Sequence, residues 1–134
     1  MPPRVIATEK ALVLLRSLKA EHGALLLHQS GGCCEGTAPM CFRQQDFQVG
    51  SQDILLGLIE DCPVFVGSAA YAYLAACQIV IDVTEGGGDS FSLEAANGVR
   101  LTTRSRLFTE AEAAELEAAG PPPRGPEALA TTRR

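Results

Sequence analysis

The spacing of apolar residues predicts a helix near the start of the chain. Between residues 9 and 23, apolar side chains recur at the spacing of one helix face: Ala11, Leu12, Leu15 and Leu18. Thr8 stands where an N-cap is needed, and Gly23 stands where a helix commonly ends. The sequence therefore opens with an amphipathic helix that presents one face to a core.

After this helix the pattern changes to short apolar runs and to alternation, both of which are typical of strands. In the first run, residues 24–29, His28 shares a face with Leu26 and points away from the leucines on either side of Leu26. Asn97-Gly98 is a hairpin signal that precedes the last strand. The predicted strands cover residues 24–29, 46–50, 53–60, 62–67, 78–83, 90–95 and 99–108.

Two further helices are predicted from capping residues. A short helix over 68–77 begins with Ser68 as its N-cap. The last helix, over 109–120, begins at Thr109, and Glu112 stands at the position of a capping-box partner.

The order of these elements favours one fold class. Helix, strands, short helix, strands and helix is not a repeating strand–helix alternation, so we predict an α+β fold with a mainly antiparallel, sandwich-like core. A single globular domain is expected over residues 1–119. Residues 120–134 are rich in proline and are expected to form an unfolded tail.

Composition narrows the possible partners. The chain has 134 residues and a net charge of −5, from 16 acidic and 11 basic side chains. A face that binds nucleic acid or anionic lipid would be basic, so we expect neither kind of partner. The start of the chain lacks the apolar segment of a secretory signal, and no apolar run is long enough to span a bilayer. We therefore expect a cytoplasmic protein whose thiols stay reduced.

Three of the five cysteines fall in one segment, HQSGGCCEGTAPMC, residues 28–41. Its glycines let the backbone turn just before Cys33, so that Cys41 can approach Cys33 or Cys34. Clustered thiols in a reducing compartment are more often metal ligands or redox groups than disulfides. Thiolates favour Zn²⁺, Cu(I), iron or an iron–sulfur cluster, and His28 could add a nitrogen ligand. The predicted metal ligands are therefore Cys33, Cys34, Cys41 and His28, and no catalytic residue is assigned.

The same segment also has a structural interpretation. Cys33 and Cys34 could be small buried residues, or loop thiols could form a local disulfide. Adjacent side chains point in different directions, so Cys33 and Cys34 do not easily share one mononuclear site. Either one faces the metal and the other faces the core, or both serve a site that is larger or is shared by two chains. Cys62 and Cys77 lie on apolar stretches, where packing in the core is expected.

The remaining polar positions favour structural roles. Asp46, Asp53 and Asp82 fall at strand or turn positions, where capping and turn hydrogen bonds are expected. Three arginines on one face of the last strand suit an anion, the carboxylate of a partner or a solvated face: Arg100, Arg104 and Arg106. The sequence contains neither a phosphate-binding loop nor the nucleophile motif of a serine hydrolase.

Three segments carry a family resemblance: SGGCCEGTAPMC, VGSQDILLGLIEDCPVFV and IDVTEGGGDSFSLEAANGVRLTTRSRLFT. Over residues 5–112 the chain resembles a bacterial family of uncharacterised small proteins that are often encoded beside aldehyde dehydrogenases. The resemblance implies a cytoplasmic bacterial protein connected with alcohol or aldehyde oxidation, and an aldehyde dehydrogenase as a partner. One departure lies before the strand at 78–83, where Leu74 and Ala76 replace an aromatic and histidine-bearing segment.

A second resemblance concerns the order of elements. Helix, strand, glycine-cysteine loop, strands, short helix and strand is similar to the A-type, or HesB-like, iron–sulfur carrier proteins. There one loop cysteine, matched here by Cys33 or Cys34, is a cluster ligand. The C-terminal Cys-Gly-Cys pair of those carriers is absent, so thiols within the loop would have to replace it.

These observations lead to three functional hypotheses. The first is a metal- or iron–sulfur-binding accessory protein that is not itself an enzyme. The second is a binding partner or stabiliser of an aldehyde dehydrogenase that holds no metal and keeps its cysteines as structural residues. The third is a thiol-dependent enzyme that acts on aldehydes. A homodimer is the expected assembly, because two-fold pairs are the commonest oligomers.

Overall fold

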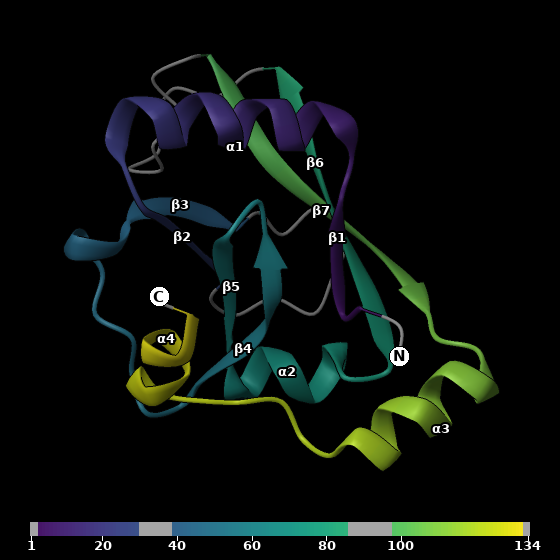
Figure 1. Cartoon of the computed structure of the whole chain (residues 1–134). Helices are drawn as coiled ribbons and strands as arrows, with labels where there is room; N and C mark the ends of the chain where they lie inside the picture. The colour runs from purple at the N-terminus through teal and green to yellow at the C-terminus, as the bar shows by residue number, and fades with distance from the viewer. Residues whose placement is uncertain (1–2, 30–38, 86–97, 133–134) are drawn as a thin grey trace.

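The computed structural model describes residues 3–29, 39–85 and 98–132, and it confirms the α+β class (Figure 1). Two β-sheets pack against each other, and helices cover the ends and one outer face. In chain order the elements are β1 (Val5–Ala7), α1 (Glu9–His22), β2 (Leu25–Gln29), β3 (Met40–Arg43), the 3-10 turn η1 (Gln44–Asp46), β4 (Asp53–Ile59), β5 (Cys62–Gly67), α2 (Ser68–Leu74), β6 (Cys77–Glu85), β7 (Val99–Leu107), α3 (Glu110–Ala119) and α4 (Pro126–Thr132).

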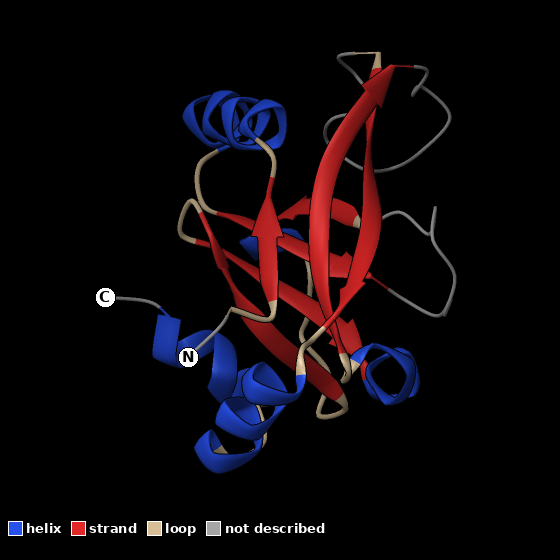
Figure 2. Cartoon of the chain, turned by 90° about the vertical axis from the view of Figure 1, so that its right-hand side faces the viewer, coloured by secondary structure: helices blue, strands red, loops and turns tan. Residues whose placement is uncertain are grey.

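Both sheets are mixed. The first, sheet A, has the order β1–β6–β7, with β1 parallel and β7 antiparallel to β6. The second, sheet B, has the order β3–β2–β5–β4, with the β2–β5 pair parallel and the other two pairs antiparallel. The strands of the two sheets cross at an angle in the side view (Figure 2). No helix in the described part of the chain is long and apolar enough to cross a membrane.

The main hydrophobic cluster lies between the sheets, and we call it the inner cluster. Sheet B contributes Leu27 and Val64, and sheet A contributes Ile81 and Leu101, all at most 2% exposed. Helix α1 packs its predicted face over one end of this cluster, and α2 lies at the opposite end (Figure 1). Burial of each such leucine or isoleucine contributes about 1.5–3 kcal/mol, so this cluster is the main source of stability.

Sheet B also has a second buried face, on the side away from sheet A. The residues that alternate with those of the inner cluster form a separate cluster there, which we call the outer cluster. Its buried members are Leu26, Val49, Leu55, Phe65, Ala128 and Leu129. Since the last two belong to α4, the C-terminal helix covers this face (Figure 1).

A β-bulge in β4 shifts the register of its pairing with β5 by one residue. Leu55 pairs with Phe65 and Gly57 pairs with Val64, so Leu56 is an additional residue in the ladder. A Cβ atom on Gly57 would lie 3.2 Å from a methyl group of Val5, which shows how closely β1 approaches β4 at this point. The bulge therefore sits where an edge strand of sheet B meets an edge strand of sheet A.

The capping predictions for the two long helices are confirmed. The hydroxyl of Thr8 accepts a hydrogen bond from the backbone N–H of Ala11 at 3.3 Å. Thr109 and Glu112 form a reciprocal capping box at the start of α3. In α2, by contrast, Gly67 is the N-cap and the helix begins at Ser68, one residue earlier than it would with Ser68 as the cap.

Several short elements differ from the prediction. β1 and β3 are strands that the sequence pattern does not reveal, because three or four residues carry too little periodicity. Residues 46–50 do not form a strand: η1 ends at Asp46, and residues 47–50 belong to no helix or strand. The predicted strand over 90–95 and the first residue of the Asn97-Gly98 hairpin signal lie outside the described residues.

The C-terminal segment also differs from the expected unfolded tail. Leu55 donates a backbone hydrogen bond to the carbonyl of Pro123, and α4 follows from Pro126. Ala128 and Leu129 are buried in the outer cluster, and this contact could not be predicted from the proline-rich composition. We call residues 120–132 the C-terminal strap.

An exposed ion pair that closes the capping box of α3 predicts a pH-dependent stability. Arg106 donates two hydrogen bonds of 3.0 Å to Glu112. The guanidinium group of Arg106 lowers the pKa of Glu112 from 4.5 to about 2, with help from the backbone N–H of Thr109. A lowered pKa in the folded state stabilises the fold above the ordinary pKa, and this stabilisation is lost as the pH falls toward about 2.

We therefore expect Glu112→Gln to lower the urea midpoint of unfolding at neutral pH and to have no effect near pH 2. Glu110→Gln, in the same helical turn, is the matched control and should leave the pH dependence unchanged. A difference between Glu112→Gln and wild type that stays constant across this pH range would contradict the assignment.

Candidate functional site

The structure places two of the four predicted metal ligands, Cys41 and His28. Cys33 and Cys34 lie outside the described residues. Cys41 is on β3, directly opposite Leu27 of β2, and it is fully buried in the inner cluster. His28 is on β2 and lies on the other face, with Leu26, as the alternation of the strand predicts. The structure therefore does not bring Cys41 and His28 together on one face of sheet B.

His28 forms a short hydrogen bond with Asp53, which is the first residue of β4. The distance between Nε2 of His28 and Oδ1 of Asp53 is 2.8 Å. Both side chains are largely buried, with 9% and 16% of their surface exposed. A carboxylate oxygen only accepts hydrogen bonds, so Nε2 of the imidazole carries the proton in this contact. In the neutral ring this arrangement leaves the lone pair on Nδ1.

Asp53 is held by its own turn. The backbone N–H of Gly50 donates to Oδ2 of Asp53 at 2.8 Å, and the backbone N–H of Asp53 donates to the carbonyl of Gly50 at 3.1 Å. The turn hydrogen bonds that the sequence predicts for Asp53 are thus present. Because the turn occupies one carboxylate oxygen, the other is directed to His28.

An aromatic pair supports the imidazole ring from the side. The ring centroid of Phe47 lies 4.8 Å from that of His28, and Phe42 stacks on Phe47 at 5.0 Å. Both phenylalanines pack against the outer cluster. The orientation of His28 is therefore fixed by a carboxylate at one ring nitrogen and by an aromatic ring against its face.

This arrangement suits two kinds of chemistry. A carboxylate that accepts the N–H of a histidine is the usual support for a histidine that ligates a metal through its other nitrogen. The same support orients a histidine that acts as a general base for a nearby thiol. Within the described ranges, no three His, Cys, Asp or Glu side chains are grouped so that they could hold a metal ion. A complete metal site that includes His28 would need ligands beyond these ranges.

The thiols in the rest of the fold have structural surroundings, as predicted for both. Cys62 is fully buried in the inner cluster, and burial raises the pKa of its thiol to about 11. Cys77 is half-buried and packs against the same cluster. A thiol with a raised pKa is a poor nucleophile at neutral pH, which agrees with a packing role for Cys62.

Three charged residues of sheet A have local partners: Asp82, Arg104 and Arg106. The hydroxyl of Thr8 donates to Asp82 at 2.8 Å and lowers the pKa of this carboxyl group, together with the backbone N–H of Val83. Arg104 forms an ion pair with Asp82, and Arg106 forms one with Glu112. These contacts support a structural role for the two arginines.

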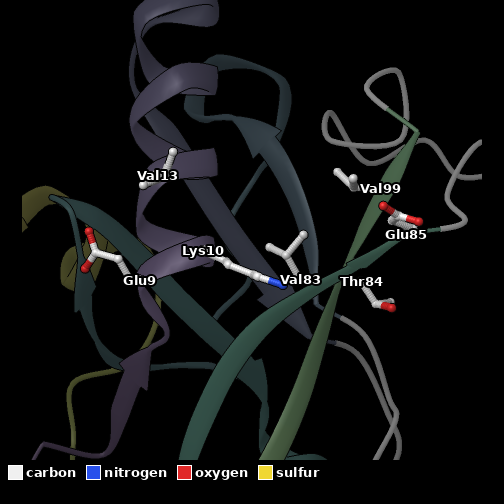
Figure 3. A pocket seen from close by; sticks show the side chains of 7 residues that line it. All are labelled: Glu9, Lys10, Val13, Val83, Thr84, Glu85 and Val99. Atoms are coloured by element: carbon white, nitrogen blue, oxygen red, sulfur yellow. The ribbon is translucent and has the colours of Figure 1, made fainter.

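A groove of about 640 Å³ lies apart from the His28–Asp53 pair (Figure 3). It runs between the first turns of α1 and the ends of β6 and β7. The side chain of Lys10 extends across it toward Val83, whereas Glu9 points away (Figure 3). None of the four predicted ligands is among its described lining residues, and its polar groups do not converge on one point.

The pair itself predicts a large effect on stability. Replacement of Asp53 by alanine would remove two hydrogen bonds and leave His28 buried without its carboxylate, so we expect Asp53→Ala to lower the free energy of unfolding by about 2 kcal/mol or more. Asp46→Ala is the matched control, since Asp46 pairs with Arg43 on the surface. That change should cost less than about 1 kcal/mol. Equal losses in urea unfolding would show that the pair does not hold the fold.

Comparison with known proteins identifies the family of this chain. A comparison with curated proteins finds no match, and a comparison with solved structures finds none either. The family model described as a domain of unknown function, DUF779, matches residues 14–107. This match includes β2 through β7, and with them His28, Asp53 and the cysteine segment. The chain therefore belongs to the DUF779 family.

Proposed function

We propose that this protein binds a soft or borderline metal ion through the imidazole of His28 and thiolates of the segment that follows β2. The observation that carries the proposal is the hydrogen bond between His28 and Asp53, at 2.8 Å. It gives the imidazole the support that metal-ligating histidines have in other proteins.

The position of His28 near the end of β2 supports a joint site with the cysteines. Gln29 is the last residue of β2, and Cys33 and Cys34 are the fifth and sixth residues after His28. Five residues of chain reach at most about 18 Å, and a turn shortens this distance, so the backbone length allows either sulfur to meet the imidazole. We assign the thiolate of Cys33 or Cys34 as the ligand that joins His28 within one chain, and both thiolates where two chains share the site or it holds more than one ion.

Cys41 has a different place in this proposal. Its side chain is in the apolar inner cluster, on the face of sheet B opposite to His28. Most described side chains of this cluster are apolar, and although Cys62 is also buried in it, no three His, Cys, Asp or Glu side chains of the described ranges are grouped so that they could hold an ion. We therefore interpret Cys41 as a packing residue and not as a ligand in the same coordination sphere as His28.

Ligand chemistry defines the class of metal. A set of imidazole and thiolate ligands suits Zn²⁺, Cu(I) or iron and disfavours Mg²⁺ and Ca²⁺. A reducing cytoplasm, which we propose as the location, would keep these thiols in the coordinating form. The family resemblance extends the proposal to an accessory role beside an aldehyde dehydrogenase, and the resemblance to A-type carriers extends it to an iron–sulfur cluster.

The same geometry supports a second candidate, a thiol-dependent enzyme. In that case Asp53 would orient His28, and Nδ1 would take the proton of a loop thiol. The two candidates differ in the state of the thiol. A metal ligand is protected from alkylation by the bound ion, whereas an activated nucleophile is alkylated faster than an ordinary cysteine.

The metal proposal predicts a defined stoichiometry. Reduced protein, titrated with Zn²⁺ in competition with a chromophoric chelator, should bind about one equivalent per chain or per dimer. Asp53→Asn should weaken the affinity by about 10- to 100-fold, because it removes the carboxylate that supports the ligand. Replacement of His28 by Gln, and joint replacement of Cys33 and Cys34 by Ser, should each weaken it more.

His22→Gln and Cys77→Ser are the matched controls, since both residues lie outside the proposed site. Their affinities should equal that of the wild type. Failure of reduced wild-type protein to bind Zn²⁺, or equal losses in the controls, would contradict the proposal. Rapid alkylation of Cys33 or Cys34 that requires His28 would then favour the enzyme.

A further inference from the structure

We propose that the C-terminal strap is a releasable clamp that holds Asp53 and covers the side of His28. The strap is residues 120–132, which include α4. It is connected to the His28–Asp53 pair by two separate routes, directly through the backbone of Asp53 and indirectly through the outer cluster and Phe47. The proposal concerns access to the imidazole and does not depend on what His28 binds.

The first route is a set of backbone hydrogen bonds to β4. Gly125 donates to the carbonyl of Asp53 at 2.8 Å, and Leu55 donates to the carbonyl of Pro123 at 2.9 Å. Arg124 and Ile54 form an antiparallel bridge between these two bonds. The strap thus extends sheet B beside the residue whose carboxylate binds His28.

The second route is side-chain packing. Ala128 and Leu129 of α4 are buried in the outer cluster, against which Phe47 also packs. Phe47 in turn lies against the imidazole ring of His28 at 4.8 Å. Release of α4 would remove part of the surface that holds Phe47 in place, and with it the cover on one side of His28.

The construction of the strap favours release as a unit. It begins at Gly120 and turns into α4 at Gly125, with φ angles of 89° and 79° that glycine adopts without strain. Among the strap side chains that the structure describes, Ala128 and Leu129 are the buried apolar ones. Segments held by few apolar contacts open more readily than the core, so the strap can open while both sheets remain folded.

Chemical modification of the two histidines tests this inference. Diethyl pyrocarbonate reacts with accessible imidazole, and peptide mass spectrometry separates His28 from His22. In the wild type, His28 should react more slowly than His22, because their side chains are 9% and 27% exposed. The variants are Leu129→Glu, which releases the strap, and a chain that ends at Gly120, which lacks the rest of the strap.

In both variants we expect the modification rate of His28 to rise at least several-fold while that of His22 stays constant. Leu107→Glu is the matched control, since Leu107 is 72% exposed and lies on sheet A, and it should leave both rates unchanged. Circular dichroism establishes whether the sheets persist in each variant, and amide exchange of α4 in Leu129→Glu establishes whether the helix is released.

Three results would overturn the proposal. An unchanged rate at His28 with rapid amide exchange in α4 would show that the strap does not cover the pair. Unfolding of the chain that ends at Gly120 would show that the strap is part of the folding core. Equal increases at His28 and His22 would indicate general loosening. Since no metal enters these measurements, they can fail or succeed independently of the metal titration.

Discussion

The burial of sheet B on both faces is the constraint on which the rest of the structure depends. Each strand of this sheet must divide its side chains between the inner and the outer cluster, so neighbouring residues have different surroundings. Cys41 and Leu27 face sheet A, whereas His28 and Leu26 face α4. A polar ring in such a place requires a hydrogen-bond partner, because burial of a polar group without one is unfavourable. Asp53 fills this need for His28.

Asp53 connects parts of the chain that are far apart in sequence. Its side chain joins β2 to the turn at Gly50, and its backbone carbonyl accepts from the strap at Gly125. A single residue at the start of β4 therefore couples the orientation of His28 to the docking of the C-terminal segment. The strap can therefore affect the orientation of His28 even though α4 carries no proposed ligand.

The sequence predicted those features that depend on residues close together in the chain. Thr8 and Thr109 marked the starts of two helices because capping depends on residues within one turn, and alternation placed His28 on the face of Leu26. The pairing of His28 with Asp53 was missed, because it depends on how β2 and β4 flank β5. A histidine on a buried strand was the one signal that a carboxylate had to lie nearby.

The missed C-terminal helix has a similar cause. Its stability comes from the contact of Ala128 and Leu129 with the outer cluster, and a composition rich in proline gives no sign of that surface. In the cysteine segment, residues 28–41, closeness in sequence suggested a contact that the strand pairing does not allow. Its spacing suggested that Cys41 and His28 share a site, but the pairing of Cys41 with Leu27 across β2 and β3 puts its side chain in the inner cluster.

The protonation state of the His28 ring tests the central claim most directly. Long-range ¹H–¹⁵N correlation spectra of metal-free, ¹⁵N-labelled protein distinguish the two neutral tautomers of histidine. We predict that His28 carries its proton on Nε2, and that Asp53→Asn alters the Nε2 signal while the spectrum of His22 stays the same. A proton on Nδ1 of His28, or an Nε2 signal that does not respond to Asp53→Asn, would contradict a site built on a carboxylate-supported imidazole.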